Sequence, residues 1–247
     1  GGEMDNGMTV GVSYTMTDAA FSTSNVTLDM GDSGKLAFGH DSAHGGIDTI
    51  KDKMPTAGEE VWDDIGTGDD AGVVDIGADA SLYYSVSMNG ISASASYART
   101  GVGTDNSVAI VASELVDGAE FGFGTGTDTA SATAENDLTT VYAKYTTGPV
   151  TVGVQLSEID KTAANSDIDR EAAAISFAVN ENLSISYGIS NVEYADASKT
   201  DAESAGVSAS YTMGGMTIGA VMNKTDSFGG TSGTDKEFSE VSLSFAF

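Results

Sequence analysis

The sequence predicts an all-β fold: a transmembrane, antiparallel, up-and-down β-barrel that forms a single domain over residues 1–247. Three observations predict it. Apolar and small polar residues alternate along short segments, turn dipeptides separate these segments, and the connections alternate between tight turns and longer polar loops. At 247 residues, one closed barrel accounts for the whole chain.

Alternation is clearest at the carboxyl end, where one face of the predicted strand is apolar and the other is small or polar. The apolar face carries Val241, Leu243, Phe245 and Phe247. The same pattern predicts about fourteen strands, near residues 8–17, 20–30, 34–40, 79–88, 91–99, 107–115, 119–126, 137–146, 149–157, 169–179, 183–194, 204–213, 216–224 and 237–247. Most approach the roughly 9–11 residues that a tilted strand needs to cross a bilayer.

The connections between the predicted strands sort by length. The tight turns are Asn89-Gly90, Val116-Asp117-Gly118, Thr147-Gly148, Asn180-Glu181-Asn182 and Gly214-Gly215. The longer, polar connections are 100–106, 127–136, 158–168, 195–203 and 225–236. Short turns on one side and long loops on the other are typical of bacterial outer-membrane barrels, and a soluble β-sandwich has no reason to sort its loops in this way.

Composition excludes several classes of function. The formal net charge is -27 with only 10 Lys plus Arg, so cations are favoured as partners and nucleic acid is excluded. The absence of cysteine excludes disulfides and thiolate metal sites. No run of about 18 apolar residues is present, which excludes a transmembrane helix. The amino end, Gly1-Gly2-Glu3-Met4-Asp5, lacks the regions of a signal peptide, so we expect a mature or truncated chain.

A long insertion over about residues 41–78 separates two predicted strands. Its apolar residues are numerous enough to pack against something, and we expect them to fold inward against the barrel wall: Ile47, Ile50, Met54, Val61, Trp62 and Ile65. Its charged residues are the predicted pore constriction: Asp48, Lys51, Asp52, Lys53, Glu59, Glu60, Asp63, Asp64, Asp69 and Asp70.

The order of these segments resembles a known family. The segment 25–40, NVTLDMGDSGKLAFGH, resembles the hairpin that leads into the constriction loop of trimeric general diffusion porins of Gram-negative outer membranes. The terminal SFAF resembles their carboxyl-terminal aromatic signal, and the resemblance is closest to the short alphaproteobacterial porins. That family usually has sixteen strands with the loop after the fifth, whereas here it follows the third. The resemblance therefore implies that two amino-terminal strands are missing from this sequence.

The resemblance implies a water-filled channel for passive diffusion of small hydrophilic solutes and ions. It also implies a homotrimer in the outer membrane, in contact with lipid and lipopolysaccharide, with no enzymatic activity and no cofactor. An acidic strip inside a narrow pore attracts cations, so we expect the channel to prefer cations. Alternation places Lys35, Lys144 and Arg170 on the lumen face, either as the positive side of the pore field or as solvated wall charges.

Other chemistry receives weaker support from the sequence. Asp63, Asp64, Asp69 and Asp70 offer hard oxygen ligands for calcium, and His40 and His44 have the spacing of a metal site only within a helix. These two histidines are the only ones in the chain, which disfavours a barrel phospholipase. The segment 122–126, GFGTG, imitates a phosphate loop but precedes no helix, so we interpret it as strand glycine where another wall packs close.

Two alternatives to a general porin stay open at this point. One is a substrate-specific or monomeric barrel channel, which a cluster of lumen aromatics would support. The other is an acidic, calcium-binding surface protein or adhesin, which would fold in response to calcium. The lack of an acidic nonapeptide repeat counts against the second alternative.

Overall fold

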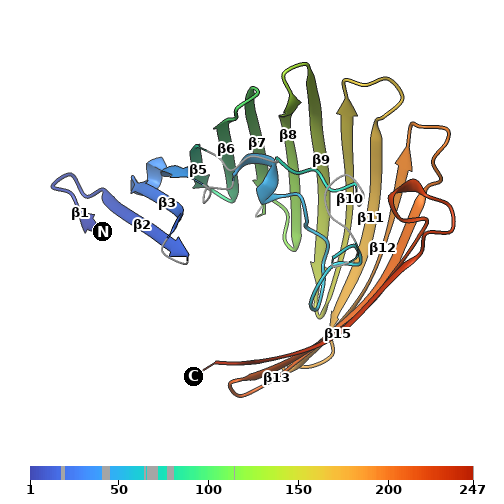
Figure 1. Cartoon of the computed structure of the whole chain (residues 1–247). Coiled ribbons are helices and arrows are strands. Elements are labelled where there is room, and N and C mark those ends of the chain that lie inside the picture. Colours follow the sequence, from blue (N-terminus) through green and yellow to red (C-terminus); the bar gives the residue numbers. More distant parts are fainter. Residues whose placement is uncertain are drawn as a thin grey trace.

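A computed structural model describes residues 1–17, 20–40, 45–63, 65, 72–76, 81–113 and 115–246. Its strands form one 15-stranded antiparallel sheet in which each strand pairs with its neighbours in the chain, from β1 to β15. Figure 1 shows that this sheet is strongly curved, with β1 and β15 at its two ends. Within the described residues, no helix is both long enough and apolar enough to cross a membrane.

The strands are β1 (Gly2–Glu3), β2 (Thr9–Thr17), β3 (Ala20–Asp29), β4 (Lys35–His40), β5 (Leu82–Met88), β6 (Ile91–Arg99), β7 (Thr104–Ala112), β8 (Ala119–Ser131), β9 (Ala134–Thr147), β10 (Val150–Lys161), β11 (Ile168–Ala178), β12 (Leu183–Tyr194), β13 (Ala202–Met213), β14 (Met216–Asp226) and β15 (Lys236–Phe245). Short 3₁₀ helices lie at η1 (Gly31–Ser33), η2 (Gly46–Thr49) and η4 (Phe228–Gly230). The predicted all-β, up-and-down architecture is confirmed, and β2 to β15 correspond one by one to the predicted strands.

The strand prediction differs from the structure most clearly in two places. The two-residue β1 was not predicted, because so short a segment carries no alternation. The predicted loop 127–136 is mostly strand, since β8 continues to Ser131 and β9 begins at Ala134. There Asp137 pairs with Asp160, so the outward face is polar. The backbone ladder continues beyond the apolar band, where the sequence signal fades.

The two faces of the sheet differ in chemistry as the alternation predicts. On β10, the outward side chains Val154 and Leu156 are exposed, whereas the inward Gln155 is buried. The inward residues of β12 and β13 are mostly small, and several are serines, as in the cross-strand pair Ser186 and Ser208. Exposed apolar residues on the outward face suit contact with lipid.

The tight turns also follow the prediction. Asn89 and Gly90 both have positive φ, 53° and 75°, as a two-residue turn between β5 and β6 requires. Such turns join the strands at one end of the sheet, while the segment between β4 and β5 starts from the opposite end.

The segment between β4 and β5, hereafter the constriction loop, lies against the inward face of the sheet (Figure 1). Its predicted apolar residues are all buried, with relative exposures between 0% and 5%: Ile47, Ile50, Met54, Val61, Trp62 and Ile65. Ile50 and Trp62 pack with inward residues of the wall such as Tyr142 and Ala172. The expectation that this loop folds inward is therefore confirmed.

Candidate pore constriction

A row of inward polar side chains, contributed by successive strands, holds the constriction loop on the wall. In chain order of the loop, these are Ser107 of β7, Gln155 of β10, Ser186 of β12, Ser208 of β13, Asn223 of β14 and Lys236 of β15. The Ser107 hydroxyl accepts from Ile47 N at 3.0 Å, and Lys236 Nζ donates to the Ile65 carbonyl at 3.1 Å. The described loop therefore crosses the wall from β7 to β15.

Gln155 makes the densest set of these contacts. Its Nε2 donates to the carbonyls of Ile50 and Lys51, and to Thr140 Oγ1, at 2.9 Å in each case. Its Oε1 accepts from Lys53 N at 3.1 Å. The side chain is fully buried, so these bonds replace all contact with water.

Glycines of the wall allow the loop to approach the strand backbone. A Cβ added at Gly124 would lie 2.8 Å from Ile50 Cδ1, and one added at Gly153 would lie 2.6 Å from Pro55 Cδ. Neither position has room for a side chain while the loop is seated. The interpretation of the GFGTG segment as strand glycine beneath another wall is confirmed at Gly124.

Two contacts join the outgoing and returning limbs of the loop. Asp48 Oδ1 accepts from Ile76 N at 3.0 Å. Lys51 Nζ pairs with Asp75 Oδ1 at 2.5 Å. Burial lowers the pKa of Lys51, but the hydrogen bond and the negative charge of Asp75 outweigh this effect and raise it. The predicted constriction residue Lys51 therefore stays protonated, and Asp75 compensates its charge.

Asp52 and Trp62 meet Arg170 beneath the loop. Trp62 Nε1 donates to Asp52 Oδ1 at 2.8 Å, and Arg170 Nη1 lies 3.7 Å from the same oxygen. The guanidinium also stacks on the indole, with Cζ 4.3 Å from the ring centroid. Arg170 lies on the inward face, as alternation predicts, but the loop covers it.

The acidic part of the constriction is Glu59, Glu60 and Asp63. Glu59 is exposed, while Glu60 and Asp63 are half-buried. Asn223 Nδ2 donates to the Glu60 carbonyl at 3.2 Å and lies 3.4 Å from the Asp63 carbonyl. Burial, together with a hydrogen bond and repulsion from Asp63, raises the pKa of Glu60 to about 8. Glu60 therefore keeps its proton near neutral pH.

The two remaining predicted wall cations differ in their surroundings. Lys144 Nζ pairs with Glu120 Oε1 at 2.9 Å, and the Tyr142 hydroxyl donates to the same oxygen at 2.8 Å. Lys35 is exposed on the inward face of β4, opposite Ser85. Lys53 is half-buried, and its backbone N–H donates to Gln155 on the wall.

The predicted calcium ligands lie largely outside the described residues. This applies to Asp64, Asp69 and Asp70, and also to His44. Within the ranges that the structure describes, no group of three or more His, Asp or Glu side chains is arranged to hold a metal ion. The calcium site at these residues with Asp63 stays a prediction.

Sequence reasoning missed Glu120, Tyr142, Gln155 and Asn223. All four are inward residues of predicted strands, so alternation identifies their face. Glu120 and Tyr142 bond each other across β8 and β9, 22 positions apart. The partners of Gln155 and Asn223 lie on a loop more than 100 residues away, and no local pattern specifies its path.

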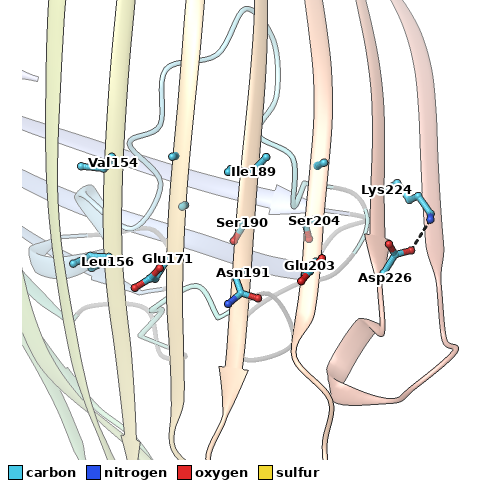
Figure 2. A pocket seen from close by; sticks show the side chains of 13 residues that line it. Val154, Leu156, Glu171, Ile189, Ser190, Asn191, Glu203, Ser204, Lys224 and Asp226 are labelled. Atoms are coloured by element: carbon cyan, nitrogen blue, oxygen red, sulfur yellow. Dashed lines mark ion pairs between the residues drawn. The ribbon is translucent and has the colours of Figure 1, made fainter.

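A groove of the described surface lies away from the constriction, on the outward face of β10 to β14. Figure 2 shows its apolar floor, formed by Val154, Leu156 and Ile189, and its polar rim. The rim contains Glu171, Asn191, Glu203, Lys224 and Asp226, with Lys224 and Asp226 paired at 2.6 Å. This groove therefore belongs to the face that carries the apolar band, not to the lumen.

A long loop lies inside a curved sheet whose outward face is apolar. Comparisons with known proteins find the same fold in porins. A family model of Gram-negative porins matches residues 1–246. None of the curated proteins matches the sequence.

Solved porin structures share the fold at low sequence identity. A refined porin structure is 16% identical with a TM-score of 0.70, covering 97% of this chain and 92% of that chain. The anion-selective porin from Comamonas acidovorans is 14% identical with a TM-score of 0.70, covering 91% and 77%. A triple mutant of the Rhodopseudomonas blastica porin is 15% identical with a TM-score of 0.64, covering 100% and 87%. The chain therefore belongs to the Gram-negative porin family, the channel proteins of the bacterial outer membrane.

Proposed function

We propose that this porin passes small hydrophilic solutes and ions by passive diffusion and prefers cations. The observation that carries the proposal is the charge of the loop over residues 54–63, which contains Glu59, Glu60 and Asp63 but no Lys or Arg. Three of the nearby cations, Lys51, Lys144 and Arg170, each face a carboxylate. A narrow passage with excess negative charge concentrates cations and repels anions.

The fold alone does not determine the sign of the preference. The Comamonas acidovorans porin is anion-selective and matches this chain with a TM-score of 0.70. The side chains at the constriction therefore have to decide selectivity, and the carboxylates of Glu59, Glu60 and Asp63 support the proposed preference for cations.

The reversal potential of purified protein in planar bilayers under a potassium chloride gradient tests the proposal. We expect cation-selective reversal, and we expect Glu59→Gln with Asp63→Asn to reduce the cation-to-anion permeability ratio by about threefold or more. Glu203→Gln is the matched control, because Glu203 lies on the outward rim and should leave the ratio unchanged. Anion-selective reversal of the unmodified channel would refute the cation preference.

We also propose that the channel is a homotrimer that contacts lipid and lipopolysaccharide. Its outward face is apolar and ends in the carboxylates of Glu171, Glu203 and Asp226, which divalent cations would bridge to anionic lipopolysaccharide. Conductance steps in groups of three are expected for the trimer. Chelation of divalent cations should loosen lipopolysaccharide from the purified protein, and chelator-insensitive retention would contradict the bridging role.

A further inference from the structure

Arg170 is a cation of the wall that is buried because the constriction loop covers it. Its side chain has 0% exposure, although it projects from the inward face of the wall. Within the described residues, Nε, Nη1 and Nη2 make no hydrogen bond. The Trp62 stack at 4.3 Å and the Asp52 carboxylate at 3.7 Å therefore compensate the buried charge.

Asp52 faces this cation and also keeps contact with solvent. Its side chain is 28% exposed, so its charge acts on permeating ions as well as on Arg170. The same Oδ1 atom that faces Arg170 accepts the Trp62 indole N–H. Since Trp62 comes ten positions after Asp52, the three side chains connect two parts of the loop to β11.

The loop also closes over Arg170 from its returning limb. A Cβ added at Gly72 would lie 2.9 Å from Arg170 Cβ and 3.2 Å from Val192 Cγ1. Arg170 is thus enclosed by Asp52, Trp62 and Gly72, while Lys35 and Lys144 keep contact with solvent. It is a wall cation whose field reaches the lumen only through the loop.

We propose that Arg170 is a selectivity-determining residue of this channel, which acts from beneath the loop by cancelling the charge of Asp52 and by fixing the loop through the Trp62 stack. This inference rests on the cation preference proposed above. It predicts that Asp52 adds little net charge to the constriction, and that the preference comes from Glu59, Glu60 and Asp63. Removal of Arg170 should expose the charge of Asp52 to permeating ions.

A charge cycle on the full chain in planar bilayers tests the inference. Arg170→Met should raise the cation-to-anion permeability ratio by about threefold, because it leaves Asp52 uncompensated. Asp52→Asn should lower the ratio by a similar factor, because it leaves the cation uncompensated. The double variant restores neutrality and should return the ratio to that of the unmodified channel. Arg170→Lys keeps the charge and should stay close to the unmodified ratio.

Further measurements separate this role from a merely structural one. Trp62→Leu removes the stack but no charge, so it should increase current noise while leaving the ratio nearly unchanged. Lys224→Met is the matched control, since it breaks an ion pair of 2.6 Å on the outward face. Resistance to trypsin reports that each variant is folded.

An Arg170→Met channel with an unchanged ratio, or a double variant that stays shifted, would overturn the inference. If Arg170→Met does not fold, the permeability ratios of Asp52→Asn and the double variant still test the inference, because only the double variant should match the unmodified channel. Because the cycle compares variants, it remains decisive even when the unmodified channel prefers anions, the result that would refute the proposed function alone.

Discussion

Replacement of Gln155 by Leu is expected to release the constriction loop from the wall and to increase both single-channel conductance and its fluctuation. Leu has a similar volume but cannot bond the carbonyls of Ile50 and Lys51 or the N–H of Lys53. Leaving a buried polar group without a partner costs about 1–3 kcal/mol, and several such groups lose their partner at once. The summed cost is on the order of 3 kcal/mol or more, enough to populate a displaced loop.

Single-channel recording and solute-swelling rates of proteoliposomes measure this effect. We expect larger sugars to enter faster through the Gln155→Leu channel, because the loop no longer narrows the lumen. Thr151→Val is a suitable control, since its hydroxyl lies on the same inward face of β10 but bonds Thr146 outside the loop seat. An unchanged conductance in folded Gln155→Leu protein would show that the loop is held by its apolar packing alone.

The fold could be predicted from sequence because a membrane constrains it so strongly. Backbone groups in lipid need partners, and the outward face must be apolar, so alternation identified β2 to β15. The inward folding of the loop followed from Ile47, Ile50 and Trp62, which need a surface to cover them. Beyond the apolar band this constraint disappears, which is why the extensions of β8 and β9 were missed.

The candidate site was less accessible to sequence reasoning. Alternation gave the correct face for Lys144 and Arg170 but not their partners, Glu120 and Asp52. Those pairs depend on packing between strands and on the path of the loop. Gln155, which makes the most hydrogen bonds between the wall and the loop, belongs to no motif. Its role follows only from its bonds to the loop backbone at Ile50 and Lys51.

Raising the pH from 6 to 9.5 is expected to increase the cation preference, with a midpoint near pH 8. Burial and the neighbouring Asp63 raise the pKa of Glu60 to about 8, from an ordinary 4.5. Near pH 6 the Glu60 carboxyl therefore holds a proton, and above pH 8 it carries a negative charge. The reversal potential under a potassium chloride gradient should move toward the cation equilibrium potential as this charge appears.

The same proton links pH to the seating of the loop. Because the folded pKa of Glu60 is raised, the seated state binds more protons than the unfolded chain between about pH 4.5 and 8. Its contribution to stability is complete below this window and is lost as the pH rises through 8, so current noise should increase on the alkaline side. Glu60→Gln removes the titrating group and should abolish the step near pH 8, keeping the selectivity that the unmodified channel has at pH 6. A step that persists in Glu60→Gln would assign the titration to another group.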